Sequence, residues 1–271
     1  MKKSNIIKAL AMLLVLVMVI GSVPVSAAKN VTAGSKKAFE KALKAKKAAT
    51  ITFSTEASGK IVLHSNANSA NKKLVVDAPN ADIVNYANYK SVNVKACKSY
   101  TEKGEENVLY VKDSNAKVEV AKNTAVAKIV VQTKKISITA NSGATMSVFA
   151  KKAGTKISVN AKASSVVGVS VDKKANLNIK GSENAFVAIA SKAEGSKVTA
   201  SMPIILEAEQ DVAITLNKGA EGSMLDKAND AIEVALTNKS EEPIFVTIGG
   251  ELPPVNPDDA STAAIKVEGV N

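Results

Sequence analysis

The sequence predicts an all-β fold, a right-handed parallel β-helix (solenoid) of about nine coils with an N-terminal capping helix. Short apolar runs recur about every nineteen residues between residues 74 and 216, in two interleaved series with the same period. Asn, Ser, Gly and Lys residues separate the runs, and Asn and Gly are typical of turns because both tolerate left-handed backbone angles. A fixed period of this length indicates stacked coils.

Each series consists of runs in which apolar residues alternate with others, the pattern of strands with one buried face. The first series comprises the triplets Leu74–Val76, Val92–Val94, Leu109–Val111, Ile129–Val131, Ser147–Phe149, Val167–Val169, Val187–Ile189 and Ile204–Leu206. The second comprises Ile83–Asn85, Tyr100–Glu102, Val118–Val120, Ile136–Ile138, Ile157–Val159, Leu177–Ile179, Val198–Ala200 and Ile214–Leu216. A β-sandwich also has short strands, but nothing in that fold imposes a constant period. Turns of changing length, without a strict hexapeptide pattern, favour the right-handed form.

The stretches Ala38–Lys47, Ile51–Phe53 and Leu74–Val84 resemble the right-handed parallel β-helix (pectate-lyase-like) superfamily, most of all the secreted Lys- and Ala-rich solenoids of Gram-positive bacteria. The resemblance covers most of the chain and is architectural. It includes no motif specific to an activity. Pectate lyases use an Asp cluster with calcium and an Arg base, and this chain has no Arg to match that base.

The chain divides into four segments. Residues 1–28 are a predicted signal peptide, with Lys2, Lys3 and Lys8 before an apolar stretch and small residues before the cleavage site. The apolar run is short for a membrane anchor, so we expect a secreted or cell-surface protein without stable membrane insertion. Residues 29–48 form the N-terminal cap, residues 49–248 the solenoid, and residues 249–271 a flexible acidic tail.

The cap contains a helix expected from about residue 36 to 47, with Ser35 as its N-cap. Its apolar face consists of Phe39, Ala42 and Leu43, which would cover the first coil. Many lysines on the same helix leave a membrane-surface helix as the alternative. At the other end, residues 231–236 and 244–248 are expected to be closing strands.

The charge is basic and unevenly distributed. The full chain carries a formal net charge of +11. Residues 29–200 contain 29 Lys and 12 acidic residues, whereas residues 201–271 contain 4 Lys and 13 acidic residues. The basic body favours anionic partners, such as cell-wall polymers or extracellular glycans. Lysines that only solubilise the rod are the alternative, and the absence of Arg with few aromatics argues against nucleic acid.

Residues that carry chemistry are scarce, which predicts a non-enzymatic protein without catalytic residues, metal or cofactor. The only His, His64, is expected at a surface or turn, and the only Cys, Cys97, is expected to be a small buried hydrophobe. A polysaccharide lyase or hydrolase is the alternative function, and it would need carboxylates that converge. One candidate set for it is Asp77, Asp82 and Asp113, for which capping of the backbone beside turns is the alternative. A second set, Glu207, Glu209 and Asp211, would need further ligands to bind calcium, and a solvated strand face is the alternative.

The best candidate for ligand contact is a group of tyrosines in the N-terminal third of the chain. Tyr86, Tyr89, Tyr100 and Tyr110 lie within 25 positions, so coil stacking would bring them into one region. Tyrosine rings stack on sugars and offer a hydroxyl for hydrogen bonding. The alternative is that these rings fill bulky corners of the core. The expected function is therefore glycan or anionic-polymer binding at the cell surface, or service as a structural stalk.

Overall fold

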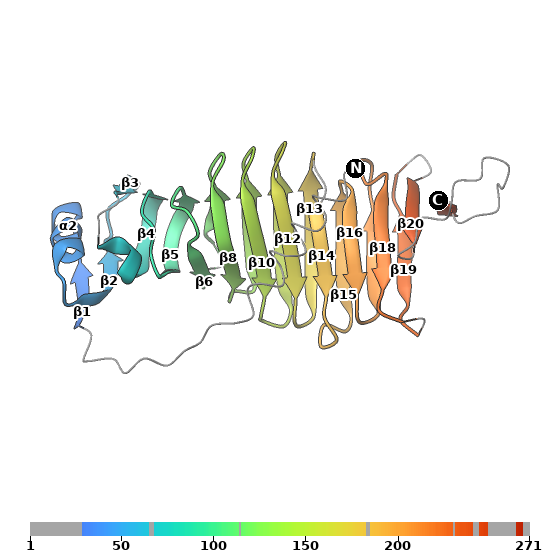
Figure 1. The fold of residues 1–271 in the computed structure, drawn as a ribbon, viewed down its shortest axis with the longest axis horizontal. Helices are drawn as coiled ribbons and strands as arrows, with labels where there is room; N and C mark the ends of the chain where they lie inside the picture. The colour runs from blue at the N-terminus through green and yellow to red at the C-terminus, as the bar shows by residue number, and fades with distance from the viewer. Residues whose placement is uncertain are drawn as a thin grey trace.

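The computed structural model describes residues 29–64, 68–113, 115–182, 185–229, 231–240, 244–248 and 264–267. These residues form a parallel β-solenoid of about ten turns, which confirms the predicted fold and adds about one turn to it. The strands lie side by side along the length of the rod, and α2 (Lys36–Lys44) lies at its N-terminal end (Figure 1).

The strands form two parallel rows, which we call sheet 1 and sheet 2. Sheet 1 contains β1 (Lys29–Ala33), β2 (Ala48–Ser54), β4 (Lys73–Asn85), β5 (Ser91–Glu102), β6 (Val108–Val111), β8 (Ala125–Val131), β10 (Thr145–Ala150), β12 (Val166–Val171), β14 (Ala185–Ile189), β16 (Ile204–Ala208), β18 (Ser223–Lys227) and β20 (Ile244–Ile248). Sheet 2 contains β3 (Gly59–Leu63), β7 (Lys117–Val120), β9 (Lys135–Ala140), β11 (Thr155–Ala161), β13 (Ala175–Gly181), β15 (Ser196–Ser201), β17 (Val212–Leu216) and β19 (Val234–Asn238). The long strands β4 and β5 pass from sheet 1 to sheet 2 and belong to both.

The core lies between the sheets and consists of alternate residues of every turn. In sheet 2, for example, one inward row is fully or almost fully buried: Ile136, Ile157, Leu177, Val198 and Ile214. Neighbouring strands stand about 4.8 Å apart, so each apolar side chain packs on its counterparts in the turns before and after. This stacking explains why the apolar runs repeat in the sequence.

The strand register differs from simple alignment of the sequence runs at several turns. The alignment would pair Ile129 with Ser147, whereas the structure pairs Ile129 with Val148 after an irregularity in β8. Phe149 consequently points outward, because a one-residue shift moves a side chain to the opposite face. Elsewhere, as in the pairing of Val118 with Ile138, the shift is two residues. A two-residue shift keeps the same face inward, so alternation alone does not reveal it.

The N-terminal cap is confirmed in its main features. Ser35 Oγ accepts a hydrogen bond from the Ala38 N–H at the start of α2, and Phe39 packs edge-on against Phe53 of β2. The helix ends at Lys44, three residues earlier than expected, and strand β1, which was not predicted, pairs in parallel with β2. Buried Lys72, next to the short 3-10 helix η2 (Ser69–Asn71), donates from Nζ to two carbonyls just past the end of α2 at 2.7 Å each.

At the C-terminal end β19 begins at residue 234, three residues later than expected, and β20 has the expected bounds. Within the segment expected to be a flexible tail, β21 (Ala264–Val267) pairs antiparallel with β20. The predicted signal peptide and the other residues of that tail lie outside the described residues. Among the described residues, no helix has the length and apolar character needed to cross a membrane.

Candidate functional site

The four predicted tyrosines do not form one surface patch. Tyr100 is completely buried and Tyr89 is 5% exposed, so neither ring has a face available to a sugar. Tyr110 points outward from β6 on sheet 1 between Asn93 and Val130. Tyr86, at 44% exposure, follows the sheet 2 end of β4. The structure therefore buries Tyr89 and Tyr100 and places Tyr86 and Tyr110 on different sheets, and contact of Tyr86 or Tyr110 with a glycan stays a prediction.

Tyr86 lies in an exposed stack with residues from the turns on both sides. The His64 ring is stacked on it with 6.0 Å between centroids, and His64 is exposed, as predicted. On the other side, Lys103 Nζ lies 4.6 Å from the ring centroid and donates to the Tyr86 hydroxyl at 2.8 Å. This hydrogen bond lowers the pKa of Tyr86. The stack is a small exposed surface of mixed aromatic and basic character.

Tyr100 belongs to a buried polar network that the sequence reasoning missed. Its hydroxyl donates to Glu102 Oε2 at 2.8 Å, while Glu102 Oε1 accepts from Asn85 Nδ2 at 2.9 Å and from the Gly104 N–H at 2.8 Å. Burial raises the pKa of Glu102 to about 7, and the hydrogen bonds oppose that rise. The sequence pattern places Glu102 on a strand but does not indicate its burial, because a Glu at an inward position leaves no trace in an apolar pattern. Its network lies where the chain leaves the sheet 2 end of β5 and returns to sheet 1.

The first acidic set is engaged in local contacts. Asp77 Oδ2 forms an ion pair with Lys95 Nζ at 2.6 Å, and Asp82 Oδ1 accepts from Ser99 Oγ at 2.6 Å. Asp113 Oδ2 accepts from the Cys97 N–H at 3.0 Å. Asp113 therefore has the expected backbone contact beside a turn, whereas Asp77 and Asp82 lie within β4 and contact side chains of β5. Cys97 itself is buried, as predicted, and burial raises the pKa of its thiol to about 12.

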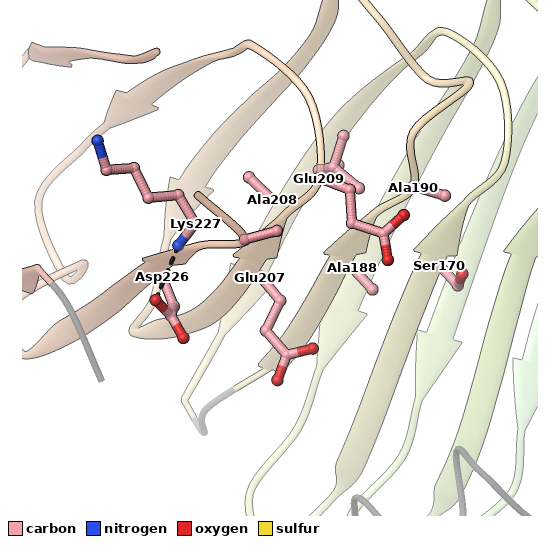
Figure 2. Close-up of a pocket in the computed structure, with 10 residues that line it drawn as sticks. Ser170, Ala188, Ala190, Glu207, Ala208, Glu209, Asp226 and Lys227 are labelled. Atoms are coloured by element: carbon pink, nitrogen blue, oxygen red, sulfur yellow. Dashed lines mark hydrogen bonds between the residues drawn. The ribbon is translucent and has the colours of Figure 1, made fainter. Parts of the chain in front are cut away.

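The second acidic set lies near an open concavity of about 340 Å³ on the outer side of sheet 1, formed by β12, β14, β16 and β18 (Figure 2). Glu207 and Glu209 line it together with Asp226, while Ser170 and Ala188 form its floor with small side chains. Glu209 Oε2 accepts from the Ser191 N–H at 3.0 Å.

Asp211, the third member of that set, is not among the residues that line the concavity. Its Oδ1 atom accepts from the Glu233 N–H at 2.8 Å. Within the described ranges, no three His, Cys, Asp or Glu side chains are arranged to hold a metal ion.

The outer side of sheet 2 is a regular polar surface. One outward row contains, in consecutive turns, Lys117, Ser137, Ser158, Asn178, Thr199, Thr215 and Thr237. A neighbouring row contains Lys135, Lys156, Asn176 and Lys197. The three lysines of this second row are exposed. The arrangement presents hydroxyls, amides and ammonium groups at intervals of about 4.8 Å along the rod.

Comparison with known proteins provides no relative: no family model, no curated protein and no solved structure matches the chain. The superfamily resemblance of the sequence therefore has no independent support. The interpretation of function depends on the two outer surfaces themselves.

Proposed function

We propose that this protein is an exported, non-enzymatic β-solenoid that binds an extended anionic polymer, of the cell wall or of an extracellular glycan, along the outer side of sheet 2. The observation that supports it is the registered pair of rows on that surface. Lys135, Lys156 and Lys197 place three ammonium groups in one line, and hydroxyl and amide side chains run beside them. A polymer parallel to the rod axis meets a similar set of groups at each turn.

Electrostatics makes this surface attractive to anions. The described part of sheet 2 from β7 to β15 carries five outward lysines, namely Lys117, Lys135, Lys156, Lys180 and Lys197, against Glu119. Lysines in adjacent turns, such as Lys135 and Lys156, reinforce one another's attraction for anions, because the strand spacing of about 4.8 Å is shorter than the Debye length of about 8 Å at physiological salt. Lysine provides diffuse charge without the bidentate geometry of arginine, which suits a repeating polymer better than one defined anionic group.

The test is binding to purified cell walls and to polygalacturonate, a defined anionic polysaccharide, at low and high salt. We expect binding at low salt that is lost near 1 M salt, where the Debye length is about 3 Å. Changing Lys135, Lys156 and Lys197 together to Glu abolishes binding. The matched control changes Lys36, Lys37 and Lys41, which are exposed on α2, and alters the net charge equally without loss of binding.

Equal loss in both triple variants shows that only net charge matters and contradicts the surface assignment. Absence of binding by the unaltered protein at both salt concentrations contradicts electrostatic polymer binding itself. New reducing ends in the polygalacturonate during the assay favour the alternative function, a lyase or hydrolase.

A further inference from the structure

The outer side of sheet 1 differs from that of sheet 2 in having large apolar side chains. Its central row, one outward residue from each turn, contains Val75, Asn93, Tyr110, Val130, Phe149, Ser170, Ala188, Glu207 and Asp226. The N-terminal half of this row has the bulky, half-buried Tyr110 and Phe149, and Val130 between them is almost fully buried. The C-terminal half begins with the small residues Ser170 and Ala188, which form the floor of the concavity in Figure 2.

Two further rows lie on either side of the central row. The flanking row contains Val108, Lys128, Ser147, Gly168, Phe186, Ile205 and Met224. The charged row contains the residue that follows each strand: Lys112, Gln132, Lys151, Asp172, Ala190 and Glu209. The charged row changes sign near its middle, from Lys151 to Asp172. The central and charged rows therefore change character at the same place, between β10 and β12, where the flanking row has the small residues Ser147 and Gly168.

We propose that a second copy of this chain docks face to face on sheet 1, with its turns running in the opposite direction. A two-fold axis that runs parallel to the strands, between β10 and β12, places each row of one copy opposite the same row of the other copy. It also reverses the order of the turns. A two-fold interface must be self-complementary. This one places the bulky Phe149 of each central row against the small Ser170 of the second copy.

Charge favours the same arrangement. In the charged row the axis places Lys151 opposite the second copy's Asp172, and Lys112 opposite the second copy's Glu209. In the flanking row Lys128, whose Nζ already lies 3.7 Å from the Phe149 ring centroid, faces the second copy's Phe186. A parallel arrangement would instead place like-charged regions together, which opposes association.

The area is sufficient for a stable dimer. From β5 to β18 the surface comprises eight strands, which span roughly 38 Å, and five residues along each strand span roughly 17 Å. Docking therefore buries about 650 Å² of each copy, or about 1,300 Å² in total, within the range of specific protein–protein interfaces. This interface leaves the outer side of sheet 2 exposed in both copies, so it is independent of the proposed polymer binding.

The test is sedimentation equilibrium of the chain lacking residues 1–28, between about 1 and 100 µM, where weak specific dimers dissociate. We expect a dimer. Lys112→Glu or Glu209→Lys alone weakens it at least tenfold, whereas the two changes together restore it. Because Lys112 and Glu209 are five strands, about 24 Å, apart in one chain, rescue requires contact between copies. Circular dichroism confirms that each variant is folded.

Cross-linking tests the orientation. Lys112→Cys combined with Glu209→Cys yields an intermolecular disulfide and a closed covalent dimer, whereas Lys112→Cys alone yields none, because the two copies of residue 112 lie far apart. A control change on sheet 2, Lys180→Glu, leaves the dimer intact. A monomer throughout the concentration range, or failure of the double charge reversal to restore association, overturns the proposal.

Discussion

The outer surfaces of sheet 1 and sheet 2 differ although the two sheets share one backbone repeat and one core. Inward positions of both sheets are occupied mostly by Val, Ile, Leu and Ala, whose side chains pack closely between stacked turns. Outward, sheet 2 carries hydroxyl, amide and Lys side chains in nearly every turn, whereas sheet 1 carries aromatic and aliphatic side chains and reverses its charge midway. Packing in the core thus constrains the inward residues of each strand. The outward residues are free to differ between the two sheets, so each sheet can bind a different partner.

The largest expected effect comes from reversing the charge of three lysines on one surface at a time. Changing Lys112, Lys128 and Lys151 of sheet 1 together to Glu abolishes the dimer, because each copy then presents acidic side chains to the acidic half of the other copy. The same variant retains polymer binding. The sheet 2 variant with Lys135, Lys156 and Lys197 changed to Glu shows the reverse, with polymer affinity at least 100-fold weaker at about 1 kcal/mol for each lysine. Sedimentation and cell-wall binding measure the two outcomes.

Both triple variants change the net charge by the same amount and lie on exposed or half-buried positions of one rod. They therefore serve as controls for each other. Loss of both activities in either variant would show that the surfaces are not independent and would refute the comparison.

The next effect concerns the core that the two surfaces share. Glu102→Gln removes the pH dependence that this carboxyl gives to folding. Burial raises the folded pKa of Glu102 to about 7 from an ordinary value of 4.5, so the folded protein holds the proton more tightly than the unfolded chain. The stabilisation is complete below pH 4.5 and is lost as the pH rises through 7, by about 3 kcal/mol.

The amide suits the network, since its oxygen accepts from Asn85 and Gly104 while its NH₂ group faces the Tyr100 oxygen. Urea denaturation of both proteins from pH 4 to pH 8 measures the difference in the free energy of unfolding. We expect the unaltered protein to lose stability relative to the variant across this range. A constant difference would mean that Glu102 titrates normally despite its burial.

The sequence predicted the fold because alternation and a constant period reflect the packing of stacked turns directly. It predicted Ser35, Phe39, Ala42 and Leu43 in the cap for the same reason, since capping and helical periodicity are local. It did not predict β1, because Val31 and Ala33, which pack on the core, are too few apolar residues to reveal a strand by alternation. The absolute register between turns was also missed, because turn lengths change and a two-residue shift preserves alternation.

The surfaces were less predictable than the core. Four tyrosines close in sequence suggested one patch, but alternation turns Tyr100 inward and Tyr110 outward. Phe149 was aligned with an inward position and in fact belongs to the outer side of sheet 1. Rows such as Lys135, Lys156 and Lys197 become visible only when the register of each turn is known. Side chains that lie in one row are about twenty residues apart in the sequence.

A smaller effect is expected from single outward residues at matched positions. Phe149→Ala on sheet 1 removes the bulky residue that meets the second copy's Ser170, so dimer affinity falls at least tenfold while the free energy of unfolding changes by about 1 kcal/mol. Ser158→Ala on sheet 2 changes stability by less than about 0.5 kcal/mol and leaves the dimer unaffected. Sedimentation and urea denaturation distinguish the two. Similar dimer affinities for both variants would show that Phe149 does not lie in the dimer interface.

The smallest effect compares two outward lysines within a single copy. Lys128 Nζ lies over the Phe149 ring, and burial, with the nearby Lys151, lowers the pKa of Lys128. Lys180 lies between Asn160 and Ser201 on sheet 2, beside no aromatic ring in its row. Lys128→Met therefore loses a cation–π contact and destabilises the fold by about 0.5 to 1 kcal/mol, measured by urea denaturation at a concentration where the dimer is dissociated. Lys180→Met leaves stability unchanged within about 0.3 kcal/mol, because a solvated lysine contributes little to folding.

Equal effects of the two substitutions on stability would show that the aromatic ring does not hold Lys128. A difference in the expected direction means that the lysines of sheet 1 are fixed by the surface beneath them, whereas those of sheet 2 extend into solvent, where a polymer can reach them.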